Sequence, residues 1–246
     1  MSVVGTVAEI WRYPVSSLAG EPLPVAEISG SGIRGDRQFG LVDAETGDIA
    51  APDQHHRWRP AARIAARWSL EGELEIAVPG GGWWPALSRD ASRAMTAHMG
   101  FSVEIRQLGS IANERWPPHP PLAVPRYERS AIHLVTSASL AELQRRLPRS
   151  LIDVRRFRPN VVVRTTEASR FPEYRWVGRA LKMGSVLLQI FEPCQRCGFT
   201  AIEQDSLPYD PEILRTLVGD NAGSFGVLCA VTNVGVVATG DAAEIV

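Results

Sequence analysis

The stretch Phe191-Glu-Pro-Cys-Gln-Arg-Cys-Gly-Phe-Thr200 organises the rest of the chain, because it carries two of the three cysteines in a C-x-x-C spacing. The apolar run before it, residues 185–191, predicts a buried strand that ends at the break imposed by Pro193. Both cysteines are then expected on the loop at the end of this strand. Arg196 lies between them and favours a thiolate, which is the form of sulfur that binds metals and attacks electrophiles.

Short strands dominate the sequence around this stretch. Helices are expected over 89–99, with Ser88 as N-cap and Gly100 after it, from the hydroxyl-rich start Thr136-Ser-Ala-Ser139 through Leu147, and over 211–218 with Asp210 as N-cap. Many short strands with few helices indicate an α+β, β-rich, barrel-like fold with peripheral helices. Strands are expected over 3–12, 25–28, 38–43, 63–68, 73–78, 102–107, 131–135, 161–163, 223–232 and 235–239.

A proline-rich strip marks the clearest change in composition. Residues 116–125 contain five prolines in ten positions, which suits neither a helix nor the interior of a sheet. We therefore divide the chain into a domain at 1–115, a connector at 116–126 and a second domain at 127–246.

The composition describes an ordinary globular protein of 246 residues with a net charge of -1 and 45% hydrophobic residues. This balance argues against nucleic-acid binding. No basic segment followed by an apolar run precedes the first strand, and no stretch is apolar enough to span a bilayer, so neither secretion nor a membrane is expected. An odd number of cysteines does not make a disulfide framework, and a reducing cytoplasm is the expected location.

Three segments have the composition of anion sites. They are the glycine-rich loop 30–37 with its arginines, the helix start at Ser137 and Ser139, and the arginine-rich turn 155–160 before a buried strand. Each also fits a solvated turn or a plain helix cap. The pair His55-His56 is expected in a solvated loop, and Cys229 is expected to be a small core residue.

The cysteine pair leaves several kinds of site open. Structural zinc needs four ligands and an iron–sulfur cluster usually needs four cysteines, whereas the pair supplies two. A thioredoxin-like dithiol is possible, but that fold begins a helix at the motif, and Cys197-Gly-Phe-Thr-Ala201 suggests a loop or strand. The remaining hypothesis is one thiolate on a metal whose other ligands come from a bound organic cofactor.

Six short segments follow one another along the chain. They are Tyr13-Pro-Val-Ser-Ser-Leu-Ala-Gly20, Gly35-Asp-Arg37, Phe157-Arg-Pro-Asn-Val-Val162, Cys194-Gln-Arg-Cys-Gly-Phe-Thr200, Ser224-Phe-Gly226 and Gly240-Asp241. In content and order they resemble the MOSC-domain family, which includes the C-terminal domain of molybdenum cofactor sulfurase and the amidoxime-reducing proteins. The resemblance implies a MOSC N-terminal β-barrel-like domain before the proline strip and a MOSC-type β-barrel with peripheral helices after it.

The same resemblance implies a set of site residues. Cys197 matches the position that ligates molybdenum and would be the catalytic residue. Ser16 stands where relatives have lysine, and Thr200-Ala-Ile-Glu-Gln-Asp205 replaces their Thr-Thr-Val-Asp-Pro-Asp-Thr-Gly. The residues expected to hold the pterin and its phosphate are Ser17, Arg37, Ser137, Ser139, Arg158, Asn160 and Thr200.

The activity implied by the resemblance is that of a molybdenum-cofactor oxidoreductase that reduces N-hydroxylated or related N-oxide and S-oxide small molecules. Three cysteines cannot hold an iron–sulfur centre, so electrons are expected from a ferredoxin-like or flavin reductase partner. The alternatives are a module that carries the cofactor or relays sulfur as a persulfide, and a scaffold that has lost the cofactor. The family also carries an association with pyridoxal phosphate enzymes.

Overall fold

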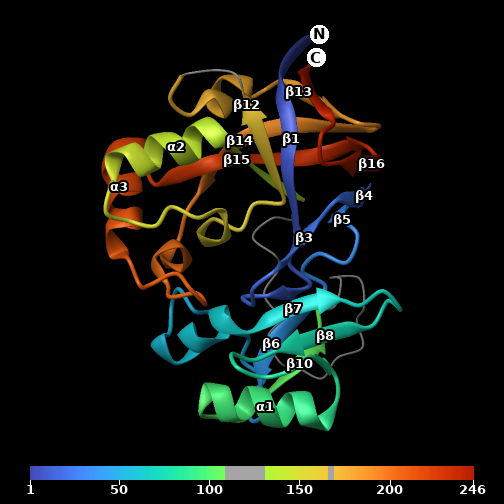
Figure 1. Ribbon diagram of the computed structural model, residues 1–246, viewed down its shortest axis with the longest axis vertical. Coiled ribbons are helices and arrows are strands. Elements are labelled where there is room, and N and C mark those ends of the chain that lie inside the picture. Colours follow the sequence, from blue (N-terminus) through green and yellow to red (C-terminus); the bar gives the residue numbers. More distant parts are fainter. Residues whose placement is uncertain (109–130, 166–168) are drawn as a thin grey trace.

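The computed structural model describes residues 1–108, 131–165 and 169–246, so the expected connector 116–126 lies outside the described residues. Figure 1 shows two bodies of strands stacked along the long axis of the molecule, with both termini at the same end. Among the described residues, no helix is both long and apolar enough to cross a bilayer.

Seven strands close into a barrel. In barrel order they are β12 (Val161–Thr165), β11 (Ile132–Thr136), β15 (Ser224–Asn233), β14 (Val186–Gln195), β13 (Ala180–Met183), β17 (Ala242–Ile245) and β1 (Ser2–Arg12). The antiparallel pairing of β1 with β12 closes the ring, and β3 (Glu21–Leu23) adds to the other edge of β1. The β-rich, barrel-type fold expected from the sequence is confirmed.

The apolar side chains of β1 hold it in the barrel, although register shifts in its pairing space the buried ones three residues apart instead of two. Val4, Val7 and Ile10 are buried in the same core as residues of β11 and β12. Each such side chain contributes about 1.5–3 kcal/mol when it leaves water. The first strand is therefore held mainly by β12 and β17 from the second half of the chain, and its end also pairs with the nearby β3.

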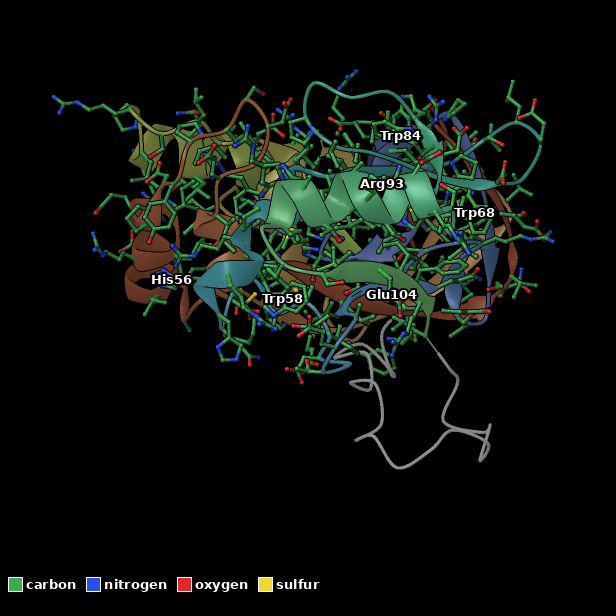
Figure 2. The ribbon with its side chains drawn as sticks, turned by 90° about the horizontal axis from the view of Figure 1, so that it is seen from below. His56, Trp58, Trp68, Trp84, Arg93 and Glu104 are labelled. Carbon is green, nitrogen blue, oxygen red and sulfur yellow. The ribbon has the colours of Figure 1, made fainter. Side chains whose placement is uncertain are left out.

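A second core lies in the other body of strands. Its two small sheets are β2 (Val15–Ser16), β6 (Phe39–Asp43) and β10 (Val103–Gln107), and β7 (Ala65–Trp68), β8 (Leu74–Ala77) and β9 (Trp84–Pro85). Helix α1 (Arg89–Met99) covers them, and Figure 2 shows it from below, with His56 and Trp58 towards one end and Trp68 towards the other. Trp58, on the 3₁₀ helix η1 (His56–Arg63), is buried in this core.

The cores do not follow the division of the sequence at residue 115. Strands β4 (Val25–Ser29) and β5 (Gly32–Ile33) form a sheet with β16 (Gly235–Ala238), and their apolar residues belong to the barrel core. The N-terminal third thus contributes to both bodies. A cut at 115 would remove β1 from the barrel it closes.

The three α-helices of the described residues begin where expected and have the expected N-terminal caps, but α3 runs to Asn221 and not to 218. The Ser88 hydroxyl accepts a hydrogen bond from the amide of Ala91 at 3.1 Å, and Gly100 ends α1 in the left-handed conformation at φ 78°. Helix α2 (Ser137–Arg146) is capped by Thr136, and α3 (Pro211–Asn221) by Asp210. Short 3₁₀ helices η2 (Val154–Arg156), η3 (Pro172–Trp176) and η4 (Gly198–Ala201) lie between strands.

The prediction that the strand before the cysteines ends at Pro193 is wrong. Strand β14 continues to Gln195, with Pro193 opposite Val227 on β15. The pairing shifts register just before and just after Pro193, and such irregularities accommodate a residue that has no amide hydrogen. Cys194 is consequently part of the strand, while Cys197 lies on the loop beyond it.

Candidate functional site

Tyr13 lies at the centre of a cationic cluster. Its side chain is 1% exposed, and its hydroxyl has no hydrogen-bond partner among the described residues. The guanidinium carbon of Arg158 lies 4.2 Å from the centroid of the Tyr13 ring, and that of Arg37 lies 5.0 Å from it. Burial raises the pKa of Tyr13 far above its ordinary value, more than the two arginines lower it, so the phenol stays neutral.

Asn160 ties the two arginines to β1. Its side-chain oxygen accepts from Arg37 Nη1 at 3.3 Å, and its Nδ2 donates to the Trp11 carbonyl at 3.3 Å. Arg37 Nη2 also donates to the Arg158 carbonyl at 3.2 Å, and Arg37 forms an ion pair with Asp36. We refer to Tyr13, Arg37, Arg158 and Asn160 as the arginine cradle.

Strained backbone marks this region. Ser17, Arg37 and Arg158 have φ angles of 69°, 49° and 51°, and they are three of the six non-glycine residues with positive φ in the described part of the chain. Left-handed backbone at such residues costs about 1–3 kcal/mol and gathers at ligand sites. All three were expected from the sequence to bind the cofactor.

Cys197 lies where the chain leaves β14 and enters η4. Its side chain is half-buried, and the Thr200 hydroxyl donates to the Cys197 carbonyl at 3.1 Å, which closes the turn. Burial raises the pKa of the Cys197 thiol, the Phe199 amide lowers it, and the nearby Asp53 carboxylate raises it again. The unliganded thiol is therefore protonated at neutral pH and needs a cation or metal to become a thiolate.

Arg196 acts on the other cysteine of the pair. Its Nη1 lies 3.0 Å from the sulfur of buried Cys194, and its Nη2 donates to the Phe157 carbonyl at 2.7 Å. Its charge lowers the pKa of Cys197 by less than burial and Asp53 raise it. Cys229 is fully buried in the barrel core, and the prediction that it is a core residue is confirmed.

Arg156 is a structural residue that the sequence did not single out. It is fully buried, and its guanidinium donates to the backbone carbonyls of Thr200, Ile202 and Pro208. It thereby fixes the loop that follows Cys197. The three arginines within residues 155–158 marked this turn in the sequence, but they did not show which of them is buried. Arg155, the neighbour of Arg156, forms a partly exposed ion pair with Asp153.

The remaining predicted residues have other partners. The Ser139 hydroxyl donates to the buried carboxylate of Glu173 at 2.6 Å, so a carboxylate of the protein itself lies at the start of α2. The Ser137 hydroxyl accepts from the Thr165 amide at 3.2 Å, and the Ser17 hydroxyl donates to the Ala50 carbonyl at 3.1 Å. The structure therefore joins Arg37, Arg158 and Asn160 into one cluster and gives the two α2 serines separate contacts.

A cavity of about 500 Å³ borders the segment that carries Cys197. Its walls come from 52–59 and from 198–219, which lie side by side in Figure 1 as the cyan and orange segments. A Cβ at Gly198 would lie 3.4 Å from the Asp53 carbonyl oxygen, so the two walls touch beside Cys197. We call this space the Tyr209 cavity, after the tyrosine in its wall.

The described part of the chain does not by itself offer a metal centre with several ligands. Over residues 1–108, 131–165 and 169–246, no three His, Cys, Asp or Glu side chains are grouped to hold a metal ion. His55 and His56 are exposed. A metal at Cys197 would take its other ligands from a bound molecule, and a single soft thiolate is suited to that arrangement.

Curated relatives carry the names of amidoxime-reducing proteins. The chain is 25% identical to mitochondrial amidoxime-reducing component 1 of Homo sapiens, over 82% of this chain and 68% of that protein. It is 24% identical to mitochondrial amidoxime reducing component 2 of Bos taurus, over 97% of this chain and 82% of that protein. The comparisons give no support to the association with pyridoxal phosphate enzymes or to a cytoplasmic location.

Among solved structures, the YUAD protein of Bacillus subtilis is similar over 98% of this chain and 94% of its own, with 14% identity and a TM-score of 0.48. Two family models match the sequence. The MOSC N-terminal beta barrel domain matches residues 4–116, and the MOSC domain matches residues 96–244. The chain therefore belongs to the MOSC-domain family.

Proposed function

We propose that this protein binds the molybdenum cofactor and reduces N-hydroxylated or related N-oxide and S-oxide small molecules. Membership of the MOSC family and the names of the curated relatives suggest a function related to this cofactor. One structural observation supports a binding site at Tyr13, Arg37 and Arg158. Among the described residues, the buried hydroxyl of Tyr13 has no hydrogen-bond partner, and the guanidinium groups of Arg37 and Arg158 lie over the ring that carries it.

The residues present fit a pterin phosphate with a metal. A buried polar atom without a partner costs about 1–3 kcal/mol, and a ligand oxygen could accept the hydrogen bond that Tyr13 does not make. Arg37 and Arg158 together outweigh the single negative charge of Asp36, so the cluster keeps a net positive charge for an anion. The cluster does so although Ser16 stands where relatives have lysine.

The proposed roles follow from these contacts. Arg158 and Arg37 bind the phosphate, Tyr13 donates its hydroxyl, and Asn160 keeps Arg37 in position. Cys197 supplies one thiolate to the metal, and Arg156 holds the loop around it. When bound, the cofactor supplies a metal that exchanges an oxygen atom and two electrons with a substrate.

The two electrons of the overall reaction must come from a second protein. Reduction of an amidoxime breaks the N–O bond, consumes two electrons and two protons, and yields an amidine and water. Three cysteines cannot hold an iron–sulfur centre, so we propose a ferredoxin-like or flavin reductase as the electron donor. A cytoplasmic location is part of the same proposal.

Turnover tests the proposal directly. The protein would be purified from a host that makes the cofactor and supplied with benzamidoxime and a reduced low-potential dye under anaerobic conditions. Formation of benzamidine above the rate given by protein from a host that makes no pterin is expected. Bound pterin and metal without any benzamidine would instead favour a cofactor carrier, and a persulfide on Cys197 after treatment with a sulfur donor would favour sulfur relay.

A further inference from the structure

The Tyr209 cavity has the size and lining of a small-molecule site. Its volume of about 500 Å³ lies within the range of about 300–1,000 Å³ that is typical of ligand pockets. Its wall includes the side chains of Tyr209, Leu214 and Val218, which are apolar or aromatic. The cavity is therefore suited to a flat or apolar body of the size of a substituted aromatic ring.

One cation in the wall stands out. The guanidinium carbon of Arg59 lies 5.2 Å from the centroid of the Tyr209 ring. Its Nε is buried and has no hydrogen-bond partner, and no carboxylate of the described residues is ion-paired with Arg59. By contrast, the other arginine of the wall, Arg215, is ion-paired with Glu212. Arg59 thus has hydrogen-bonding capacity and charge that a ligand anion could satisfy.

The cavity is lined by residues next to Cys197, although Cys197 itself is not part of its wall. Gly198, which follows Cys197, and Asp53, whose carboxylate contacts the Cys197 thiol, both lie in its wall. A ligand in the cavity can therefore place one end towards Cys197 and its other end towards Arg59. Asp53 disfavours an anion at the Cys197 end, which leaves Arg59 as the anion-binding position.

We propose that the Tyr209 cavity is the substrate pocket and that Arg59 selects aromatic or apolar N-hydroxylated compounds that carry a carboxylate. This inference rests on the proposed function, because that function supplies the N-hydroxylated class of substrate. Binding in the cavity, however, needs only the residues of its wall and not the cofactor.

Binding of matched ligands tests this pocket. Isothermal titration calorimetry would compare benzamidoxime with its 4-carboxy, 4-carboxamide and 4-aminomethyl derivatives. The 4-carboxy compound is expected to bind wild-type protein about tenfold more tightly than the neutral ones, which corresponds to about 1.4 kcal/mol. Equal affinities, or a preference for the 4-aminomethyl cation, would overturn the role of Arg59, and this comparison needs no variant.

Three variants locate the effect. Arg59→Gln is expected to lower the affinity for the 4-carboxy compound to that for benzamidoxime. Val218→Trp, at a position that is 60% exposed, is expected to fill the cavity and to weaken both ligands at least tenfold. Arg93→Ala, on the exposed face of α1, is the control and should change neither affinity.

The outcomes separate the pocket from the proposed function. Carboxylate-selective binding that depends on Arg59, in a protein without molybdenum or turnover, would keep the pocket and end the oxidoreductase proposal. Reduction of benzamidoxime with unchanged affinities in Val218→Trp would keep the oxidoreductase and end the pocket. Retention of the carboxylate advantage by Arg59→Gln would also overturn the inference.

Discussion

The guanidinium of Arg158 lies 4.2 Å from the centroid of the Tyr13 ring, while the hydroxyl of that tyrosine is buried without a hydrogen-bond partner. Arg158 reaches this position from a left-handed backbone conformation and is held by the Leu18 carbonyl. The strained backbone of Arg158 and the unsatisfied hydroxyl of Tyr13 therefore lie at the same place. Such costs are expected where a ligand later supplies the missing contacts.

Tyr13→Phe separates stability from ligand binding. Removing an unpaired buried hydroxyl should leave the free energy of unfolding of the cofactor-free protein unchanged or raise it by about 1 kcal/mol. The same change should lower the amount of pterin that copurifies. Urea unfolding and pterin fluorescence measure the two effects.

Tyr174→Phe is the control for Tyr13→Phe. The Tyr174 hydroxyl accepts a hydrogen bond from Asn221 at 2.6 Å, so its loss should lower the free energy of unfolding by about 1 kcal/mol. A similar loss for Tyr13→Phe would contradict the account.

Arg156→Ala tests what fixes the loop of Cys197. The buried guanidinium satisfies several backbone carbonyls, so its removal should lower the free energy of unfolding by about 3 kcal/mol. Alkylation of Cys197 by iodoacetamide should become faster because the loop loosens. The adjacent Arg155→Ala should cost less than about 1 kcal/mol, since Arg155 is in a partly exposed ion pair with Asp153. Equal costs for the two variants would show that Arg156 has no special role.

Glu173 gives the protein a pH-dependent stability. Burial raises the pKa of this carboxyl, although the hydroxyls of Ser139 and Thr136 partly oppose the shift. A carboxyl whose pKa is raised in the folded state stabilises the fold fully below its unfolded pKa of about 4.3, and this contribution is lost as the pH rises through the folded value. Glu173→Gln should therefore fall further below wild type in melting temperature at pH 5 than at pH 8. A difference that grows towards pH 8 would mean that the folded carboxyl is preferentially ionised.

Local features of the fold could be predicted from the sequence because the determining contacts are local. Ser88 and Gly100 bound α1 through a cap and a left-handed residue within a few positions. The alternation of β1 indicated a strand, but not its partner, since β12 is about 150 residues away and is reached through pairing that no local pattern encodes. The strand through Pro193 was missed for the same reason, because the opposing register on β15 decides whether a proline is tolerated.

Some residues of the candidate site could likewise be predicted from the sequence, and others could not. Arg37, Arg158 and Asn160 were found through motifs that the family resemblance supplied, and the structure brings them together. The partner of Ser139 could not be predicted, because Glu173 reaches the start of α2 from 34 residues away. Arg59 and the Tyr209 cavity gave no signal in the sequence, since the cavity exists only where 52–59 meets 198–219.

The content of molybdenum and pterin in purified protein tests the central claim most directly. Wild type, Cys197→Ser, Cys194→Ser and Cys229→Ser would be produced in a host that makes the cofactor, then measured by mass spectrometry for metal and by fluorescence for pterin after denaturation. We expect near one molybdenum per wild-type chain, at least a tenfold loss of metal in Cys197→Ser, and retention in folded Cys194→Ser and Cys229→Ser. Wild type without metal and pterin, or Cys197→Ser with its metal intact, would contradict the account.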